Sequence, residues 1–289
     1  SACWNAWANC GHHRVNAAHD SKEERLPFPA HELVYDLPGA GLVAVLELAE
    51  PEQSQGISQW TMLEPEPEAA GAAGAVSKRE DVLFGSRVWP VSHACALRLL
   101  ECGVVGCSVL ELGCGCGLVA LAARQAGASL VFATDASKVS LQLVNASARR
   151  QERPGGALPS PGSRQSNVSD ADAGLRLGPL FTAPFDVTSE KMLPRPSCCL
   201  PRDRAVPSPP LTPRDAFDFV VFSDVLYQEE TARGFGRRAA QALASGSVVV
   251  VADPGWRQAD FHSALQEELR ALALPNPAPR PEPLHFPEW

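Results

Sequence analysis

The sequence lacks three features, and each absence excludes a class of protein. No apolar run reaches the length of a membrane span, so we expect a soluble protein without a membrane partner. Lysine and arginine total 25 against 33 aspartate and glutamate residues, and the net charge of −8 gives no electrostatic footprint for nucleic acid. The nine cysteines are scattered and odd in number, which favours reduced thiols in a reducing compartment over a disulfide framework.

The positions of cysteine and histidine do not indicate a metal site. Cys10 with His12 and His13, or Cys198 with Cys199, would be the candidates, but neither group has partners at the spacing of a zinc centre. The sequence shows no signal-peptide pattern and begins with Ser rather than Met, which leaves a targeting peptide open. We therefore expect a cytoplasmic protein, with the nucleus or an organelle as alternatives.

The most informative segment is a short apolar strand that runs into three alternating glycines. The strand is predicted over 108–112. The glycines that follow it are Gly113, Gly115 and Gly117. An amphipathic helix then begins at Leu118, and a second strand over 130–134 delivers Asp135 at its carboxyl end. Strand, glycine turn, helix, strand and acid form the nucleotide-binding half of an open α/β sheet.

The spacing of the glycines argues against a dinucleotide as the ligand. A dinucleotide-binding turn needs its third glycine three places after the second, and Leu118 occupies that place. Glycines let the backbone approach a ligand closely, and Asp135 can accept hydrogen bonds from ribose hydroxyls. Cys114 and Cys116 lie inside the turn, where their small size explains them. The alternative is a tight strand-to-helix turn that binds nothing.

The rest of the chain alternates helices and strands around this motif. Helices are predicted over 90–102, 118–126, 137–150, 229–244 and 258–272. Strands are predicted over 108–112, 130–134, 180–187, 217–223 and 247–252. Alternating elements with continuous valine-rich runs are typical of a parallel sheet that is covered on both faces. We therefore predict a doubly wound, mostly parallel Rossmann-like sheet of the α/β class.

Before residue 82 the pattern changes. Two apolar runs over 33–37 and 42–48 flank a Pro/Gly turn and predict a β-hairpin. The first 30 residues have no clear period and are interpreted as a loose tail. Residues 62–80 are rich in Glu, Pro, Ala and Gly and predict a linker. The chain thus divides into an N-terminal extension over 1–81 and a catalytic domain over 82–289.

Two proline-rich insertions are predicted inside the catalytic domain. The first covers 153–175 and combines Pro, Gly, Ser and Asp with almost no apolar periodicity. We expect it to be disordered, because it cannot bury enough apolar surface to offset the entropy of ordering. The second covers 193–213.

Three local motifs indicate a family. Residues 84–90 read Phe-Gly-Ser-Arg-Val-Trp-Pro, residues 111–118 read Glu-Leu-Gly-Cys-Gly-Cys-Gly-Leu, and residues 223–227 read Ser-Asp-Val-Leu-Tyr. They resemble the family 16 members of the class I, seven-strand S-adenosylmethionine-dependent methyltransferases, most of which are protein-lysine N-methyltransferases. An Asp-Pro-Gly turn at 253–255 is similar to the branch that modifies an electron-transfer flavoprotein subunit. The resemblance covers residues 82–272.

The resemblance implies S-adenosylmethionine as the cofactor and a role for each matching residue. The methionine part would lie against the turn formed by Glu111, Gly113, Cys114, Gly115 and Gly117. Asp135 would hold the ribose, Asp186 would contact the adenine amino group, and Trp89 would wall the pocket. Ser223 would meet the cofactor through its backbone. The other interpretations are core packing for Trp89 and a turn cap for Asp186.

The same resemblance places Asp224 and Tyr227 at the transferred methyl group, and the chemistry supports the pair. Methyl transfer is an in-line displacement from a sulfonium by a neutral nitrogen, so the enzyme must align the two and deprotonate the amine. Asp224 can receive a lysine ammonium, and the ring of Tyr227 can attract the cation. The other interpretations are a helix cap for Asp224 and an ordinary half-buried ring for Tyr227.

We therefore predict a monomeric enzyme that methylates a nitrogen of a protein side chain, foremost lysine, with arginine and histidine as further acceptors. A small-molecule N- or O-methyltransferase and an inactive methyltransferase-fold binding protein stay open, because a fold does not determine its substrate. An enzyme that modifies nucleic-acid bases is disfavoured. Such enzymes carry Asn/Asp-Pro-Pro-Tyr/Phe where this acidic chain has Asp-Val-Leu-Tyr.

Overall fold

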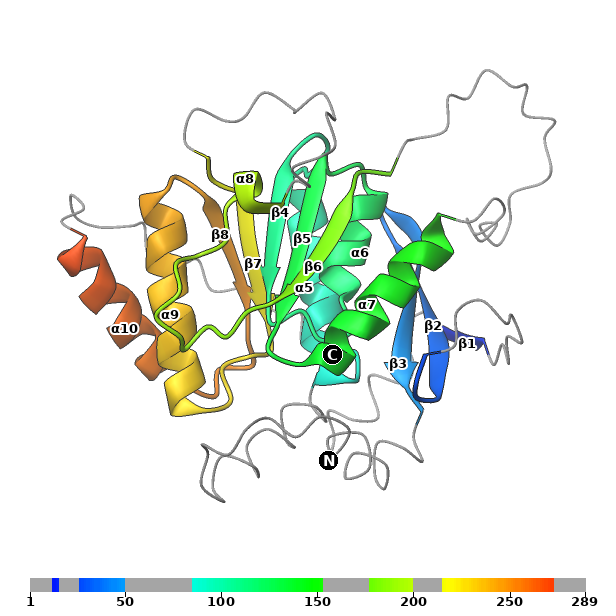
Figure 1. Cartoon of the computed structure of the whole chain (residues 1–289), viewed down its shortest axis with the longest axis horizontal. Helices are drawn as coiled ribbons and strands as arrows, with labels where there is room; N and C mark the ends of the chain where they lie inside the picture. Colours follow the sequence, from blue (N-terminus) through cyan, green and yellow to red (C-terminus); the bar gives the residue numbers. More distant parts are fainter. Residues whose placement is uncertain (1–11, 16–25, 50–84, 153–176, 200–214, 273–289) are drawn as a thin grey trace.

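The structure of this chain is a computed structural model. The residues that it describes are 12–15, 26–49, 85–152, 177–199 and 215–272 (Figure 1). The predicted linker over 62–80 and the predicted insertion over 153–175 lie outside these ranges.

A five-stranded parallel sheet forms the centre of the molecule (Figure 1). Its strands are β4 (Ser108–Leu112), β5 (Leu130–Asp135), β6 (Leu180–Pro184), β7 (Phe219–Ser223) and β8 (Val248–Ala252). Their order across the sheet is β6-β5-β4-β7-β8, and every neighbouring pair is parallel. The predicted doubly wound parallel sheet is therefore confirmed. Phe185 to Val187, which were predicted to extend the third strand, instead leave it as a turn.

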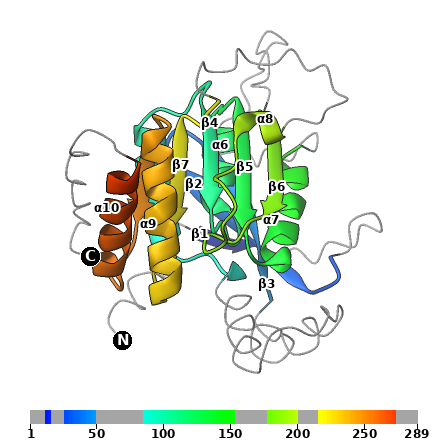
Figure 2. The ribbon, with the colours of Figure 1, turned by 60° about the vertical axis from the view of Figure 1, so that its left-hand side comes forward.

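Two layers of helices cover the faces of the sheet (Figure 2). One layer contains α5 (Pro90–Glu101), α6 (Leu118–Gln125) and α7 (Lys138–Gln151). The other contains α9 (Glu229–Ala244) and α10 (Gln258–Ala271). Successive strand residues point to opposite faces, so Val109 packs into the first core and Leu110 into the second. Both faces are buried, which explains why the strand sequences are apolar almost throughout.

The predicted hairpin consists of β2 (Ala30–Leu37) and β3 (Gly41–Leu48), which pair antiparallel. A third strand, β1 (His12–Val15), pairs with β2. The interpretation of the first 30 residues as a loose tail is thus wrong for residues 12–15. Their sequence has no apolar alternation, and the strand is recruited because the free edge of β2 offers backbone hydrogen bonds.

The hairpin shares a hydrophobic core with the helix layer formed by α5, α6 and α7. Leu46 N donates to Ser147 Oγ of α7 at 2.9 Å, and Gln125 Nε2 of α6 donates to Leu42 O at 2.8 Å. Buried hairpin side chains such as Val43 and Leu37 belong to the same hydrophobic cluster as the sheet side chains that face this helix layer. The division of the chain at residue 81 stays a prediction, but hairpin and sheet pack as one body around this core.

Part of the second proline-rich stretch is ordered. Residues Pro196–Cys199 form the short helix α8. Ser197 donates to Asp215 from both its backbone N–H, at 3.1 Å, and its hydroxyl, at 2.7 Å. These bonds join α8 to Asp215, which lies close to the start of β7 in the sequence. No helix among the described residues is long and apolar enough to cross a membrane.

Candidate active site

The cavity lies at the carboxyl ends of the parallel strands, where the strand order reverses. β4 and β7 are neighbours, yet the chain leaves β4 toward one helix layer and β7 toward the other. Open α/β sheets bind their ligands at this switch point, because the two loops diverge and leave a crevice. Here the crevice is a cavity of about 830 Å³, within the range of small-molecule sites.

The structure brings ten of the predicted site residues together around this cavity. They are Trp89, Gly113, Cys114, Gly115, Gly117, Asp135, Asp186, Ser223, Asp224 and Tyr227. Glu111 is the exception and lies beneath the cavity floor, at 2 % exposure. These residues come from five separate segments of the chain, and the parallel sheet aligns the ends of those segments at one edge.

The glycine turn has a left-handed backbone at each of its three glycines, with φ of 66° at Gly113, 50° at Gly115 and 78° at Gly117. L-residues with a Cβ avoid this region. Gly117 N donates to Cys114 O at 2.7 Å and closes the turn. A Cβ on Gly117 would also lie 2.5 Å from Val144 Cγ2 on α7, so packing alone requires glycine there.

Asp135 joins the end of β5 to the glycine turn. Its Oδ2 accepts from Gly115 N at 2.8 Å, and its Oδ1 accepts from Ser137 N at 2.7 Å. Ser137 in turn caps α7, because its side chain accepts from Ser140 N. A carboxylate has about four acceptor positions, so Asp135 can hold the turn and still accept from a ligand hydroxyl on the cavity side.

Glu111 supports the turn from below. Its Oε2 accepts from Ala120 N of α6 at 2.9 Å. Burial raises the pKa of this carboxyl to about 8, while the Ala120 hydrogen bond acts in the opposite direction and the charge of Asp135 adds to the rise. Because Glu111 does not line the cavity, its position favours a role in orienting α6 behind the glycine turn over direct contact with a ligand.

Asp186 is exposed and lines the cavity two residues after the end of β6. Its Oδ1 accepts from Thr188 N at 2.8 Å and from Thr188 Oγ1 at 2.6 Å, which is the turn-capping arrangement that formed the alternative interpretation. Phe185 and Val187 beside it are buried and line the same cavity. The cap therefore fixes an acid between two apolar walls, and this combination suits a flat heterocycle that carries an amino group.

Trp89 and Ser223 lie on either side of the start of α5. Trp89 is half-buried and precedes Pro90, the first residue of that helix. Ser223 ends β7 and donates from its hydroxyl to Ser92 Oγ of α5 at 3.1 Å. The first turn of α5 is thereby tied to the carboxyl end of β7, and both Trp89 and Ser223 line the cavity.

Asp224 is a half-buried acid with an unusual backbone. Its φ is 53°, a left-handed value that is uncommon outside glycine, and its N–H donates to Ala252 O of β8 at 2.9 Å. Burial, and then the charge of Asp253, raise the pKa of its carboxyl to about 6. The alternative interpretation as a helix cap is wrong, since α9 begins at Glu229 and Gln228 is its capping residue.

Asp253 does not line the cavity but supports the loop that carries Asp224 and Tyr227, and it received no role in the sequence analysis. Its Oδ2 accepts from Leu226 N at 3.2 Å, and its Oδ1 accepts from Gly255 N at 2.7 Å and Trp256 N at 3.2 Å. One carboxylate thus joins the loop after β7 to the loop after β8. The signal that could have identified it was the Asp-Pro-Gly turn, which places an acid directly after a strand.

The lining fits S-adenosylmethionine. Asp135 offers acceptors for the ribose hydroxyls, and Asp186 between Phe185 and Val187 suits the adenine. The left-handed backbone of the glycine turn exposes main chain without a side chain at Gly115. Asp224 and Tyr227 complete the opposite rim. Among the described residues, no group of three or more His, Cys, Asp or Glu could hold a metal ion.

Comparison with known proteins identifies the family. A family model described as "Methyltransferase domain" matches residues 45–287, well over half of the chain. One curated relative is the electron transfer flavoprotein beta subunit lysine methyltransferase of Rattus norvegicus, 27 % identical over 195 residues. That alignment covers 65 % of this chain and 58 % of the relative, so the chain spans little more than half of the relative's length.

Solved structures with detectable similarity include two methyltransferases. An S-adenosylmethionine-dependent methyltransferase from Mesorhizobium loti is 23 % identical with a TM-score of 0.30, and the match covers 53 % of this chain and 50 % of the other. Magnesium protoporphyrin IX methyltransferase from Synechocystis PCC 6803 is 18 % identical with a TM-score of 0.36, covering 75 % of this chain and 81 % of the other.

Proposed function

Because the chain belongs to the S-adenosylmethionine-dependent methyltransferase family, we propose that it transfers a methyl group to a nitrogen of a protein side chain, foremost lysine. The observation that carries the proposal is the turn after β7. It places a carboxylate and an aromatic ring, Asp224 and Tyr227, in the cavity lining after β7, on the other side of β4 from β5 and its terminal Asp135. The similarity to a lysine methyltransferase adds support from the sequence.

The two rim residues suit an ammonium group. Asp224 is half-buried, so its attraction to a cation is less screened than it would be at the surface. Its pKa of about 6 keeps it ionised at neutral pH. Tyr227, three residues later, is half-buried on the same rim and adds the negative face of its ring. Together they can receive a lysine head group and hold it at the mouth of the cavity.

S-adenosylmethionine supplies a methyl group bound to a positively charged sulfur. The acceptor nitrogen would attack the methyl carbon with its lone pair while the carbon–sulfur bond breaks, and S-adenosylhomocysteine would leave as a neutral thioether. A lysine ammonium must therefore first release a proton. Asp224 is a weaker base than a lysine amine, and its task is to orient the nitrogen and stabilise the ammonium before that proton leaves to solvent. The buried apolar neighbours Val225 and Leu226 keep this turn in place.

Labelling of a lysate tests the proposed function. The purified chain, incubated with methyl-labelled S-adenosylmethionine and whole-cell lysate, is expected to place label on protein, and amino-acid hydrolysis is expected to release methyl-lysine. Label on small metabolites alone would support the small-molecule alternative. Cofactor binding without any label would support an inactive binding protein. The control is the Asp224→Asn variant, which keeps the size of the side chain.

Two variants of Tyr227 are expected to lose methyl transfer to different extents. Tyr227→Phe keeps the ring and removes only the hydroxyl, so we expect it to retain more methyl transfer than Tyr227→Ala. A ring–cation contact contributes about 0.5–2 kcal/mol, so Tyr227→Ala should lose about two- to thirtyfold in kcat/KM. Initial rates at saturating cofactor measure both variants. Equal rates for the Phe and Ala variants would overturn the ring–cation role, because the ring would then contribute nothing to the rate.

A monomeric state and a cytoplasmic location are parts of the proposal that rest on the sequence. They stay predictions, as does the absence of a nucleic-acid partner.

A further inference from the structure

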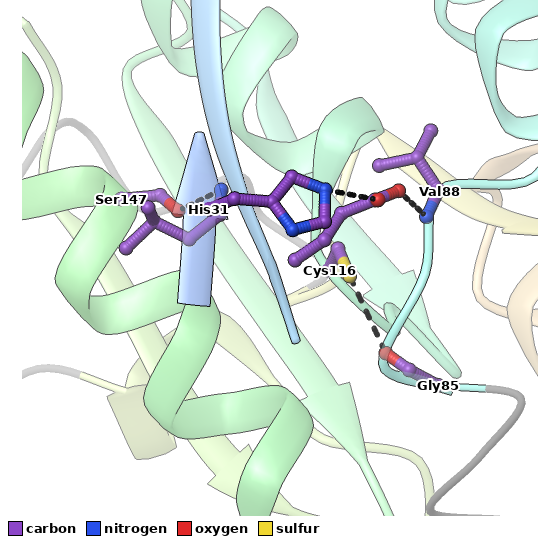
Figure 3. A network of polar contacts seen from close by, with 7 residues as sticks. His31, Gly85, Val88, Cys116 and Ser147 are labelled. Atoms are coloured by element: carbon purple, nitrogen blue, oxygen red, sulfur yellow. Dashed lines mark hydrogen bonds and ion pairs between the residues drawn. The ribbon is translucent and has the colours of Figure 1, made fainter. Parts of the chain in front are cut away.

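The N-terminal hairpin places a buried carboxylate beside the cavity wall. Glu47 of β3 is 4 % exposed, and each of its oxygens has its own partner (Figure 3). Oε1 accepts from the backbone N–H of Val88 at 2.5 Å, and Oε2 accepts from His31 Nε2 at 3.1 Å. A buried carboxylate is costly unless it is hydrogen-bonded, so these contacts hold Glu47 and Val88 in one arrangement.

Val88 belongs to a wall segment, residues 85–89, which lies between the hairpin and the glycine turn. On the hairpin side, Leu48 N donates to Ser86 O at 3.1 Å. On the other side, Gly85 O accepts from Cys116 Sγ at 3.6 Å (Figure 3). It also accepts from Ser140 Oγ at 3.2 Å. Four residues of this segment line the cavity. They are Gly85, Arg87, Val88 and Trp89.

The hairpin also contributes to the cavity directly. Phe28, two residues before the start of β2, is 5 % exposed and lines the cavity together with Pro27. Glu47 itself is absent from the lining. Its influence on a ligand therefore acts through the wall segment.

We propose that Glu47 is a positioning residue for the cofactor. Through the N–H of Val88 it holds the wall segment, and with it Trp89, at the distance from the glycine turn that the cofactor requires. The hairpin is thereby part of the cofactor site. The inference rests on the proposed use of S-adenosylmethionine by this cavity.

Two conservative variants of Glu47 separate the effect of side-chain length on cofactor binding from the effect of charge. Glu47→Gln keeps the length of the side chain and an oxygen that can accept from Val88, but it removes the charge. Glu47→Asp keeps the charge and withdraws the oxygens by one methylene, too far for the 2.5 Å contact. Calorimetric titration with S-adenosylmethionine should give near wild-type affinity for Glu47→Gln and about tenfold weaker binding for Glu47→Asp.

Two further readouts distinguish positioning from general destabilisation. Hydrogen exchange of the peptide over 85–89 without cofactor should be faster in Glu47→Asp and unchanged in Glu47→Gln. At saturating S-adenosylmethionine, kcat of Glu47→Asp should stay within about threefold of wild type, so the loss appears in KM for the cofactor. The matched control is Ser147→Ala, which removes the hairpin's bond to α7 at Leu46 and leaves the wall segment untouched.

The outcomes separate this inference from the proposed function. Wild-type affinity in Glu47→Asp, or equal losses in Glu47→Asp and Ser147→Ala, would overturn the positioning role. Equal losses in Glu47→Asp and Glu47→Gln would also overturn it, because charge would then be the cause. Failure of the wild-type chain to bind S-adenosylmethionine would instead contradict the cofactor assignment.

Discussion

The Asp224→Asn variant is expected to lose most methyl transfer while it binds S-adenosylmethionine within a few-fold of the wild-type affinity. The amide keeps the size of the carboxyl group and removes the charge that receives an ammonium. Hydrogen bonds to charged groups contribute about 1.5–3 kcal/mol, and the loss should be at least ten- to hundredfold in kcat/KM. Methyl incorporation into lysate protein and calorimetric cofactor affinity measure the two effects separately.

The raised pKa of the Asp224 carboxyl predicts that turnover falls at acidic pH. Burial and Asp253 raise the pKa of Asp224 to about 6, so the group is ionised above that pH and neutral below it. Attraction to an ammonium requires the ionised form, and turnover should therefore fall as the pH drops through about 6. The pH dependence of turnover in the Asp224→Asn variant should lack this fall near pH 6. A wild-type rate for Asp224→Asn would remove the acceptor role, and a selective loss of cofactor binding would assign the residue to the cofactor pocket.

Loss of cofactor binding is expected when the glycine turn or its acid is changed. Gly115→Val places branched carbons on a residue with φ of 50°, where an added Cβ would already lie 3.2 Å from Gly85 O. A β-branched residue is strained at such a φ. The added carbons would also crowd Gly85, and both Gly85 and Gly115 line the cavity. We expect no measurable binding of S-adenosylmethionine by calorimetry.

A second glycine provides the matched control. Gly106 has a φ of 75° and no atom within 4 Å of an added Cβ, and it does not line the cavity. Gly106→Val therefore carries comparable backbone strain, and it should bind the cofactor as wild type does. If both valine variants lost binding equally, strain in the fold would explain the effect.

The Asp135→Ala variant is also expected to weaken cofactor binding. It deletes the acceptor proposed for the ribose and also frees two backbone donors, Gly115 N and Ser137 N. The lost ligand hydrogen bonds amount to about 1.5–3 kcal/mol, or about ten- to hundredfold in affinity. Unchanged affinity in this variant would show that the ligand lies elsewhere.

The sequence by itself determined the central sheet and the turn at its edge. Each element of that sheet is encoded locally: the glycines over 113–117 follow directly on β4, and Asp135 ends the next strand. Right-handed crossovers limit the topologies that such an alternation allows, whereas the strand order β6-β5-β4-β7-β8 was decided by the tertiary structure. The position of Asp224 could also be predicted from the sequence, because this residue directly follows the fourth predicted strand.

Only the tertiary structure decided the contacts that hold the site from outside these motifs. Asp253 reaches the N–H of Leu226 across 27 residues, and Glu47 reaches that of Val88 across 41. Neither pairing leaves a periodic pattern, because a single side chain that bonds a distant backbone N–H imposes no repeat. The strand at residues 12–15 is a similar case. It forms because β2 has a free edge, a property of the folded hairpin that these four residues do not encode.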